Sequence, residues 1–420
     1  MKWEMVKLED VCTLVTSGGT PLTSISSYYE PKEIPWLKTG EVNYCRIHET
    51  ENYISIEGLE HSSAKLIPEN SVIIAMYGQG DTAGRVAINK IPLATNQACC
   101  NLIIDQNVAD YEFIYYALCT LYDYLVAQKS GGAQPNLNAK KIKELKIPFP
   151  PLKIQHRIAT ILSAYDDLIE NNQRQIKLLE EAAQRLYKEW FIDLRFPGYE
   201  NTPVHDGVPE GWEEKPIGDL ISYEIGGGWG DEKPSNSADH GAFVIRGTDV
   251  YGLTHGGLME IPFRYHGYNN LAARALQNGD IVFEVSGGSR TEGVARTALI
   301  IENMLVRWHN PVMCASFCKL IRPITPEHSQ YLFDHFQYLR ASGKTEEYDK
   351  RSASSIVNYR WKDFLSQETI LEPNKPVLDL YNQNAAIIYD AIVAKSLQIE
   401  TARDARDRLL PKLMSGEIDI

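Results

Sequence analysis

The sequence predicts an α+β protein in which two similar mixed α/β modules alternate with two long helices. The second half repeats the first, because Trp3-Glu4 recurs as Trp212-Glu213 at an offset of 209 residues. Short runs of β-branched residues between glycine-rich turns fill most of each half, which is typical of strands. Each half ends in a segment whose apolar residues follow steps of three and four, the period of paired helices. The expected segments are a module over 1–150, a helix over 151–197, a module over 198–375 and a helix over 376–420.

The composition indicates a globular chain with an excess of negative charge. The 420 residues are 44% hydrophobic, which is enough for more than one core. The net charge of −13 excludes a surface coated with nucleic-acid-binding charge, so any DNA contact must be local. The chain has no run of 18 apolar residues and no signal-like start, so we expect a cytoplasmic protein without membrane contact. The odd number of cysteines, seven, favours reduced thiols.

The repeat begins with an opening strand and a glycine-rich turn. The turn is Ser17–Pro21 in the first module and Gly226–Gly230 in the second. The segment Trp36–Val42 of the first module is matched by Val244–Val250 of the second, and a basic residue, Lys38 or Arg246, stands at the same place in both. These matched positions predict that the two modules share one fold.

The repeat continues through a turn and a β-branched strand, over 65–74 in the first module and over 274–283 in the second. Each strand runs into a glycine-rich loop followed by an arginine, Arg85 or Arg296. Another strand and a short aromatic helix follow in both modules. We therefore expect the two glycine-rich loops to lie on the same face of each module.

The long segments are expected to pair with one another, because neither can bury its apolar stripe alone. Proline-rich stretches at 148–151 and 372–376 mark where they begin. The first helix, from Ile154 to Trp190, would be about 55 Å long. Asn172 and Lys395 are polar seam positions that could fix the register at some cost in stability. The seam residues singled out for pairing are Ile158, Tyr165, Asn172, Leu179 and Leu186 in the first helix, and Ile388, Lys395, Ile399 and Leu409 in the second.

Fragments that resemble enzyme motifs are incomplete. Ser342–Thr345 resembles the end of a phosphate-binding loop, but Tyr338 stands where that motif needs glycine. The Gly226–Gly230 run aligns with a turn of the first module, so a shared turn is the better interpretation than a cofactor loop. His309, Cys314 and Cys318 lack a further ligand for zinc. The sequence therefore predicts no catalytic residue, no metal site and no cofactor in this chain.

Polar loops remain as the candidate functional residues. Asn and Gln can pair bidentately with adenine, and Arg and Lys with guanine or phosphate, so loops rich in them suit the reading of base edges. The alternative is that they are ordinary surface loops. The candidates for DNA contact are Lys38, Thr39, Tyr77, Gly78, Gln79, Arg85, Asn96, Gln97, Gln134, Asn136, Asn138, Arg246, Thr248, Ser286, Ser289, Arg290, Arg296, Asn310, Arg351 and Arg360.

The chain resembles the specificity (S) subunit of a type I restriction-modification system over nearly its whole length. The motifs that carry the resemblance are Ile34–Val42, Asn96–Ala98, Gly131–Leu137 leading to Ile147–Leu152, Trp190–Asp193 and Arg408–Ile418. The second module departs from the pattern, because it has Ser354–Asn358 in place of a Gln-Pro-Asn-Leu loop.

The resemblance implies two target-recognition domains, each reading one half of a bipartite sequence in double-stranded DNA, joined by two long antiparallel coiled-coil helices. It also implies two methyltransferase (M) subunits docked on the helices, and motor-nuclease (R) subunits. Those partners would use S-adenosylmethionine, ATP and Mg, and this chain would be a non-catalytic recognition subunit. Two alternatives stay open, a coiled-coil adaptor that does not bind DNA and a stand-alone DNA-modifying enzyme.

Overall fold

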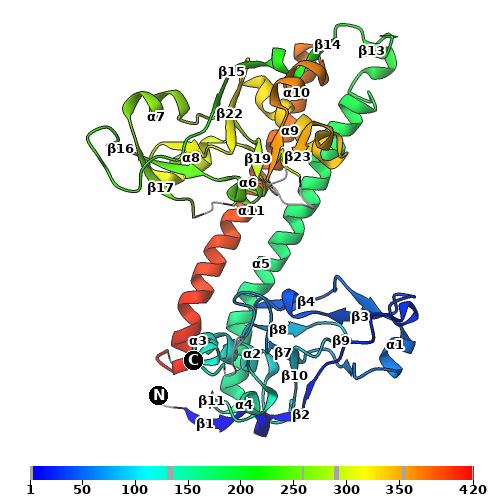
Figure 1. Ribbon diagram of the computed structural model, residues 1–420, viewed down its shortest axis with the longest axis vertical. Helices are drawn as coiled ribbons and strands as arrows, with labels where there is room; N and C mark the ends of the chain where they lie inside the picture. Colours follow the sequence, from blue (N-terminus) through cyan, green and yellow to red (C-terminus); the bar gives the residue numbers. More distant parts are fainter. Residues whose placement is uncertain (1–2, 130–135, 258–259, 288–292, 352–355, 419) are drawn as a thin grey trace. The chain divides into compact units, whose positions relative to one another are not determined.

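The computed structural model describes residues 3–129, 136–257, 260–287, 293–351, 356–418 and 420. Its contacts divide into unit 1, which is Met1–Leu168 with Ala402–Ile420, and unit 2, which is Ile169–Thr401. The fold class is α+β, as the sequence predicts (Figure 1). The division runs through both long helices, so the four segments expected from the sequence are not four separate compact bodies.

Unit 1 is built on a five-stranded sheet in the order β2-β10-β7-β8-β4. Its neighbours are antiparallel except β4 and β8, which are parallel. The strands of this sheet are β2 (Cys12–Ser17), β10 (Cys99–Ile104), β7 (Val72–Ala75), β8 (Val86–Asn89) and β4 (Cys45–Ile47). All four residues of β7 are buried, which explains its uninterrupted apolar sequence.

A second sheet and several short elements complete unit 1. The sheet order is β5-β3-β9-β6, and β3 is parallel to β9. Asp110 begins α2 by accepting hydrogen bonds from the backbone N–H groups of Glu112 and Phe113. The bounds are β3 (Ile34–Leu37), β5 (Tyr53–Ile54), β6 (Leu66–Ile67), β9 (Leu93–Thr95), the ribbon β1 (Glu4–Lys7) with β11 (Lys146–Phe149), α1 (Ile56–Glu60), α2 (Tyr111–Cys119), α3 (Tyr122–Ala127) and α4 (Ala139–Lys143).

Unit 2 repeats this topology. Its main sheet has the order β15-β22-β18-β20, which matches β2-β10-β7-β8, and β16 is parallel to β21 as β3 is to β9. The main strands are β15 (Ile221–Gly226), β22 (Cys318–Pro323), β18 (Ile281–Glu284), β20 (Thr297–Leu299), β16 (His240–Ile245), β17 (Phe263–His266) and β21 (Val312–Cys314). The other strands are β12 (Val204–His205), β13 (Val208–Pro209), β14 (Glu213–Pro216), β19 (Ser286–Gly287), β23 (Asp349–Arg351), β24 (Val357–Tyr359) and β25 (Thr369–Glu372). The helices are α6 (Gly247–Thr254), α7 (Tyr268–Arg274), α8 (Glu302–Trp308), α9 (Glu327–Ala341) and α10 (Trp361–Gln367).

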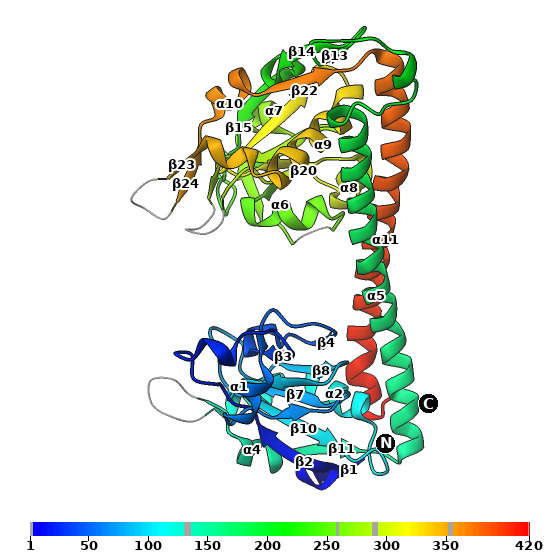
Figure 2. The ribbon, with the colours of Figure 1, turned by 90° about the vertical axis from the view of Figure 1, so that its right-hand side faces the viewer.

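The two long helices are α5 (Leu152–Tyr187) and α11 (Lys375–Ser415) (Figure 2). Helix α5 begins just after the proline-rich stretch at 148–151, and α11 begins within the stretch at 372–376. A π-helical turn, Lys188–Ile192, extends α5. Within unit 2 the helices are antiparallel, because the Asn172 amide donates to Gln398 Oε1 (3.1 Å) while the rings of Trp190 and Tyr381 lie 5.8 Å apart. Within unit 1 the Arg406 guanidinium contacts Asp166.

The helix seam follows the expected period with a local shift of one residue. The sequence period also places Leu168 and Asn384 in the seam, but Leu168 is exposed and Ile169 is buried in its place, and likewise Asn384 is exposed and Ala385 is buried. The shift arises because each helix packs against a globular core as well as its partner, so its buried face is wider than a two-helix seam. Of the residues singled out for pairing, Ile158, Asn172 and Ile399 are buried, whereas Tyr165, Leu179, Leu186, Ile388, Lys395 and Leu409 are half-buried.

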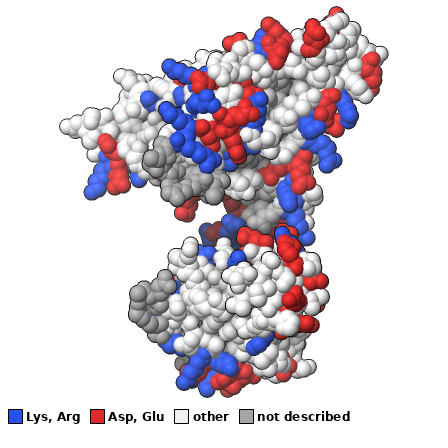
Figure 3. Space-filling view, turned by 45° about the vertical axis from the view of Figure 1, so that its right-hand side comes forward, with Lys and Arg blue, Asp and Glu red and all other residues white. Residues whose placement is uncertain are grey.

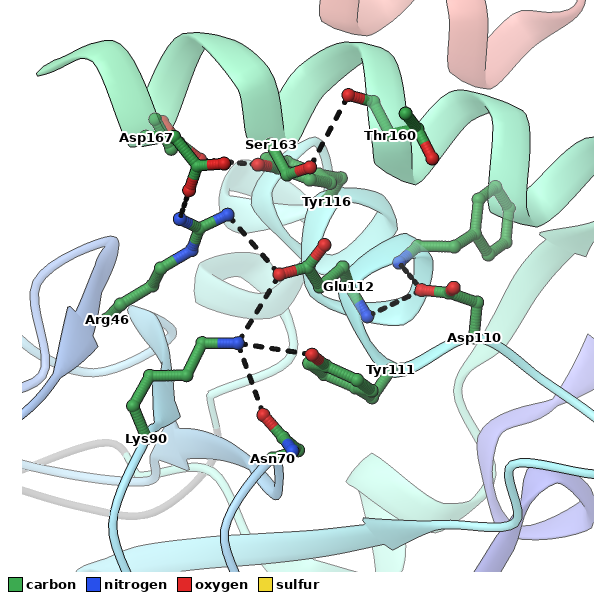
Figure 4. Close-up of polar contacts among 12 residues, drawn as sticks. Arg46, Asn70, Lys90, Asp110, Tyr111, Glu112, Tyr116, Thr160, Ser163 and Asp167 are labelled. Carbon is green, nitrogen blue, oxygen red and sulfur yellow. Dashed lines mark hydrogen bonds and ion pairs between the residues drawn. The ribbon is translucent and has the colours of Figure 1, made fainter. Parts of the chain in front are cut away.

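Charged groups fix α5 on the core of unit 1 (Figure 4). Glu112 on α2 lies 3.3 Å from the Arg46 guanidinium and 3.4 Å from Lys90 Nζ. Arg46 also contacts Asp167 on α5, and Arg46 is itself largely buried. Because these charges compensate one another at a partly buried contact, they orient α5 on this unit.

No helix in the described part of the chain is both long enough and apolar enough to cross a membrane. All seven cysteines lie in the described ranges, and none of them is in a disulfide bond.

Candidate nucleic-acid interface

Three backbone hydrogen bonds bring the polar loops of unit 1 to one edge. The N–H of Asn96 donates to the carbonyl of Leu37 (2.9 Å), and the N–H of Met76 donates to that of Ala98 (2.8 Å). The N–H of Leu137 donates back to the carbonyl of Met76 (3.0 Å). These bonds place the residues next to them on segments that meet. We call this region the polar edge of unit 1, and its residues are Lys38, Tyr77, Gln97 and Asn136.

The same three bonds recur in unit 2. They run from Ala315 to Ile245 (2.8 Å), from Val285 to Phe317 (2.9 Å) and from Tyr359 to Val285 (2.9 Å). The structure therefore makes Arg246 equivalent to Lys38, Ser286 to Tyr77 and Asn358 to Asn136. Ser286 Oγ donates to Asn358 Oδ1 (3.0 Å), so Asn358 itself lies beside the residue equivalent to Tyr77.

In both units an acidic residue three positions later holds the backbone of the basic residue. The N–H of Lys38 donates to Glu41 (3.0 Å), and the N–H of Arg246 donates to Asp249 (2.8 Å). The Arg246 guanidinium also donates to both oxygens of Asp249, which raises the pKa of Arg246. These bonds orient the Arg246 side chain, and the Lys38 side chain is held separately, because its Nζ donates to Asn52 Oδ1 (2.9 Å).

Arg85 and Arg296 are also equivalent, but their partners differ. Arg85 pairs with Asp81 (2.6 Å), whose side chain is 74% exposed. Arg296 makes two hydrogen bonds, of 2.7 and 2.8 Å, to the carboxylate of Glu284, which is only 1% exposed. The two arginine side chains are similarly exposed, so the difference is that Arg296 makes a bidentate ion pair with a buried carboxylate, whereas Arg85 pairs with an exposed one.

A cavity of about 650 Å³ lies at this edge in unit 2. Four of the sequence candidates line it, namely Arg246, Thr248, Ser286 and Arg296. Trp229 and Phe317 also line it and are 41% and 51% exposed, which is unusual for large aromatic side chains. Sequence reasoning missed both aromatic residues, although the glycines around Trp229 were the available signal.

A second, more open groove of about 800 Å³ in unit 2 is lined by basic residues and their neighbours. Figure 3 shows Lys and Arg side chains gathered over part of unit 2 among acidic ones. The buried Tyr359 hydroxyl in this groove has no hydrogen-bond partner among the described residues. Of its cations only Arg360 was a sequence candidate. The lining is Lys319, Asp349, Lys350, Tyr359, Arg360, Trp361, Lys362 and Asp363.

Three sequence candidates have roles or positions that differ from the expectation. Asn138 caps α4, because its side chain accepts a hydrogen bond from the N–H of Lys141 (2.9 Å). Thr39 is only 8% exposed. Asn310 precedes β21, whereas the cavity lies beyond the other end of that strand. These residues therefore do not join the polar edge in the way the loop pattern predicted, because the sequence does not show which strand end faces the site.

The remaining candidates lie on the surface or outside the described residues. Gly78 and Gln79 are exposed, and Arg351 is exposed beside Asp349 at 3.9 Å. Three candidates, Gln134, Ser289 and Arg290, fall outside the described residues.

Within the described ranges, no three His, Cys, Asp or Glu side chains are close enough together to hold a metal ion. Cys314 and Cys318 are fully buried strand residues, and burial raises the pKa of the Cys314 thiol to about 12.

The fold and the repeated polar edge define a protein made of two similar modules. Residues 1–181 match the family model described as the type I restriction modification DNA specificity domain. The specificity subunit of the type I restriction enzyme MjaIX from Methanocaldococcus jannaschii is 28% identical, over 100% of this chain and 94% of the relative. The Escherichia coli EcoR124I/EcoR124II specificity subunit is 31% identical over 43% of this chain and 45% of its own length.

A solved S subunit from M. genitalium has the same fold, with a TM-score of 0.58 at 14% identity, covering 98% of this chain and 96% of that one. The chain is thus similar to type I restriction-modification specificity subunits, over residues 1–181 in the family model and over its whole length in the MjaIX relative.

Proposed function

We propose that the chain reads a bipartite sequence in double-stranded DNA for a type I restriction-modification complex. Residues 1–150 and 198–375 act as target-recognition domains, one for each half of the sequence. The observation that carries the proposal is the identical set of three backbone hydrogen bonds that assembles a polar edge in both units. Asparagine, glutamine and arginine at such an edge have the donors and acceptors that distinguish base pairs in the major groove.

The long helices serve as the docking site for two methyltransferase subunits, which use S-adenosylmethionine, and motor-nuclease subunits, which use ATP and Mg, join that complex. Large apolar side chains remain exposed on the helices, including Leu178 (63%) and Ile387 (71%). Apolar side chains exposed on a helix face are typical of a protein interface. The docked partners also explain how an acidic chain functions on DNA, because they supply part of the positive charge that neutralises the phosphates.

Co-expression with the adjacent methyltransferase, followed by mapping of methylated adenines across the host genome, tests the proposal. A single bipartite motif that requires this chain is the expected result. A soluble complex that binds S-adenosylmethionine but adds no methylation and does not bind DNA specifically would instead favour the coiled-coil adaptor.

The basic groove of unit 2 is expected to contact DNA phosphates. Replacing Lys350 and Lys362 with alanine should lower the slope of log K against log salt by roughly 2, about one per lysine, with the recognised sequence unchanged. Filter binding of the full complex at several salt concentrations measures the slope. Lys233→Ala, an exposed lysine of unit 2 outside the groove, is the matched control. An unchanged slope in the double variant would assign the groove a different role.

Exchange of residues 198–375 for the same region of a relative is expected to change one half of the methylated motif only. The two polar edges are built from separate sets of residues, one within each unit, so each should read its half independently. Methylome mapping of the hybrid complex gives the result directly. A change in both halves would show that the units do not read DNA separately.

The helices are expected to set the gap between the two halves. Seven residues inserted after Leu168, with seven more after Thr401, lengthen both helices by about 10 Å, the rise of roughly three base pairs. The insertion points lie between the units, so contacts inside each unit are kept. The methylated motif should keep both halves and gain about three base pairs between them. An unchanged gap would mean that the helices do not act as a ruler.

A further inference from the structure

The cavity of unit 2 combines aromatic surfaces with polar groups at its walls. Its volume of about 650 Å³ lies in the range of small-molecule sites. Trp229 and Phe317 supply exposed rings, while Arg246, Glu284 and Ser316 supply donors and acceptors. Flat rings and a few hydrogen-bonding groups are the chemistry that binds a nucleobase.

The aromatic pair occurs in unit 2 alone. Thr20 takes the place of Trp229 in unit 1, since Gly19 and Gly228 make equivalent bonds, to the carbonyls of Thr95 and Cys314 (both 2.9 Å). Ala98 takes the place of Phe317, since their carbonyls accept the equivalent bonds from Met76 and Val285. A DNA-reading function shared by both units therefore does not explain why unit 2 has aromatic side chains at these two positions.

Neighbouring groups hold the Trp229 ring in place. The Arg264 guanidinium lies 4.8 Å from the ring centroid, in cation–π contact. Gly227, two residues before Trp229 in the turn, packs so tightly that an added Cβ would lie 2.2 Å from the carbonyl oxygens of Cys314 and Ala315. A ring fixed in this way loses little conformational entropy when a base stacks on it.

Glu284 lines the cavity, and two glycines lie close to its carboxylate. A Cβ at Gly247 would lie 2.8 Å from Glu284 Oε1, and one at Gly287, whose φ is +133°, would lie 3.0 Å from it. The absence of side chains there lets the backbone approach the buried carboxylate and keeps space in the cavity. The ion pair with Arg296 holds the carboxylate in a fixed direction.

We propose that this cavity is a nucleobase pocket that receives one everted base of the target DNA. The inference rests on the proposed DNA-reading function and adds a step to it. Reading of base edges inside the major groove requires side chains that project into the groove. A concave pocket with aromatic walls can instead hold a base only after that base has left the helical stack. The everted base differs from the methylated adenine, which must enter the active site of the methyltransferase.

The test uses the complete complex with its methyltransferase and the motif found by methylome mapping. An abasic analogue is placed opposite each base of the unit 2 half in turn, which removes the cost of unpairing that base. At one position besides the methylated adenine, the affinity of the complex for the modified DNA should rise by roughly tenfold or more, because unpairing a base costs a few kcal/mol. Trp229→Ala and Phe317→Ala should abolish this gain. Both side chains are about half exposed, so their truncation leaves the core intact.

Tyr268→Ala is the control variant, since Tyr268 is 67% exposed in unit 2 and does not line the cavity. A gain that survives in both aromatic variants, or no gain at any second position, would overturn the pocket while specific methylation still supports the DNA-reading function. Equilibrium dialysis with AMP, CMP, GMP and TMP distinguishes a soluble source of the base. Saturable binding of a free nucleotide that requires Trp229, without any effect of unpairing, would assign the cavity to that nucleotide instead. Absence of sequence-specific methylation would contradict the proposed function itself.

Discussion

Arg296→Met is expected to destabilise unit 2 by about 3–5 kcal/mol, because it leaves the buried carboxylate of Glu284 without its ionic partner. Glu284 is 1% exposed and receives both of its bidentate hydrogen bonds from Arg296. The same substitution should also abolish recognition of one half of the DNA sequence, since both residues line the cavity at the polar edge. Urea unfolding and methylome mapping measure the two effects.

Arg85→Met is the matched control in unit 1. Arg85 occupies the position equivalent to Arg296, but its acidic partner Asp81 is exposed, so its loss should change the free energy of unfolding little. Adding Glu284→Gln to Arg296→Met should recover most of the lost stability, because it removes the unpaired charge. Equal destabilisation by the two arginine substitutions would contradict the assignment of a buried pair to unit 2.

Asp334→Asn is expected to change how the stability of unit 2 depends on pH. Asp334 on α9 is buried and accepts hydrogen bonds from Tyr381 and Tyr389 (both 2.6 Å) and from Gln330 (2.9 Å). Burial raises the pKa of Asp334 to about 6 from its usual 3.8, although these donors lower it. The raised pKa stabilises the folded state fully below about pH 4, and this contribution is lost as the pH rises through 6.

The asparagine variant cannot ionise, so it does not lose this contribution as the pH rises. Its free energy of unfolding should therefore rise relative to that of the wild type by about 3 kcal/mol between pH 4 and pH 7, from about two pKa units at 1.4 kcal/mol each. Urea unfolding of both proteins across this range gives the difference. His335 is adjacent in sequence, and burial lowers its pKa to about 3, but its contribution is common to both proteins and cancels. Asp390→Asn, at an exposed position of α11, is the control. A difference that does not vary with pH would show that Asp334 ionises normally.

The duplication of the fold is the feature that the sequence predicted most completely. Matching turns and strand endings implied two modules of one fold, and the two main sheets do share their strand order. Lys38 and Arg246 were matched to one another from the sequence. The structure confirms that these two residues occupy the same place, because their backbone N–H groups donate to the carboxylates of Glu41 and Asp249. This inference succeeds because a duplicated fold keeps its short-range pattern of turns, glycines and strand ends.

The phase of the helix seam and several site residues could not be predicted in the same way. A period of three and four residues does not show that Ile169 rather than Leu168 is buried, because the globular core widens the buried face. The loop pattern likewise did not distinguish Asn138, which caps a helix, from Asn136, which lies at the polar edge. An amide has the same composition in both roles, and only its neighbours separate them.

The amino-acid sequence by itself determined the order of modules and helices, the positions of the turns and the kinds of polar group carried by each loop. These properties depend on residues close together in the chain. The tertiary structure alone decided that Arg296 pairs with a buried carboxylate while Arg85 pairs at the surface, and that Trp229 meets Phe317 in a cavity. Those outcomes bring together residues up to 88 positions apart, from 229 to 317, which happens only when the strands have assembled into sheets.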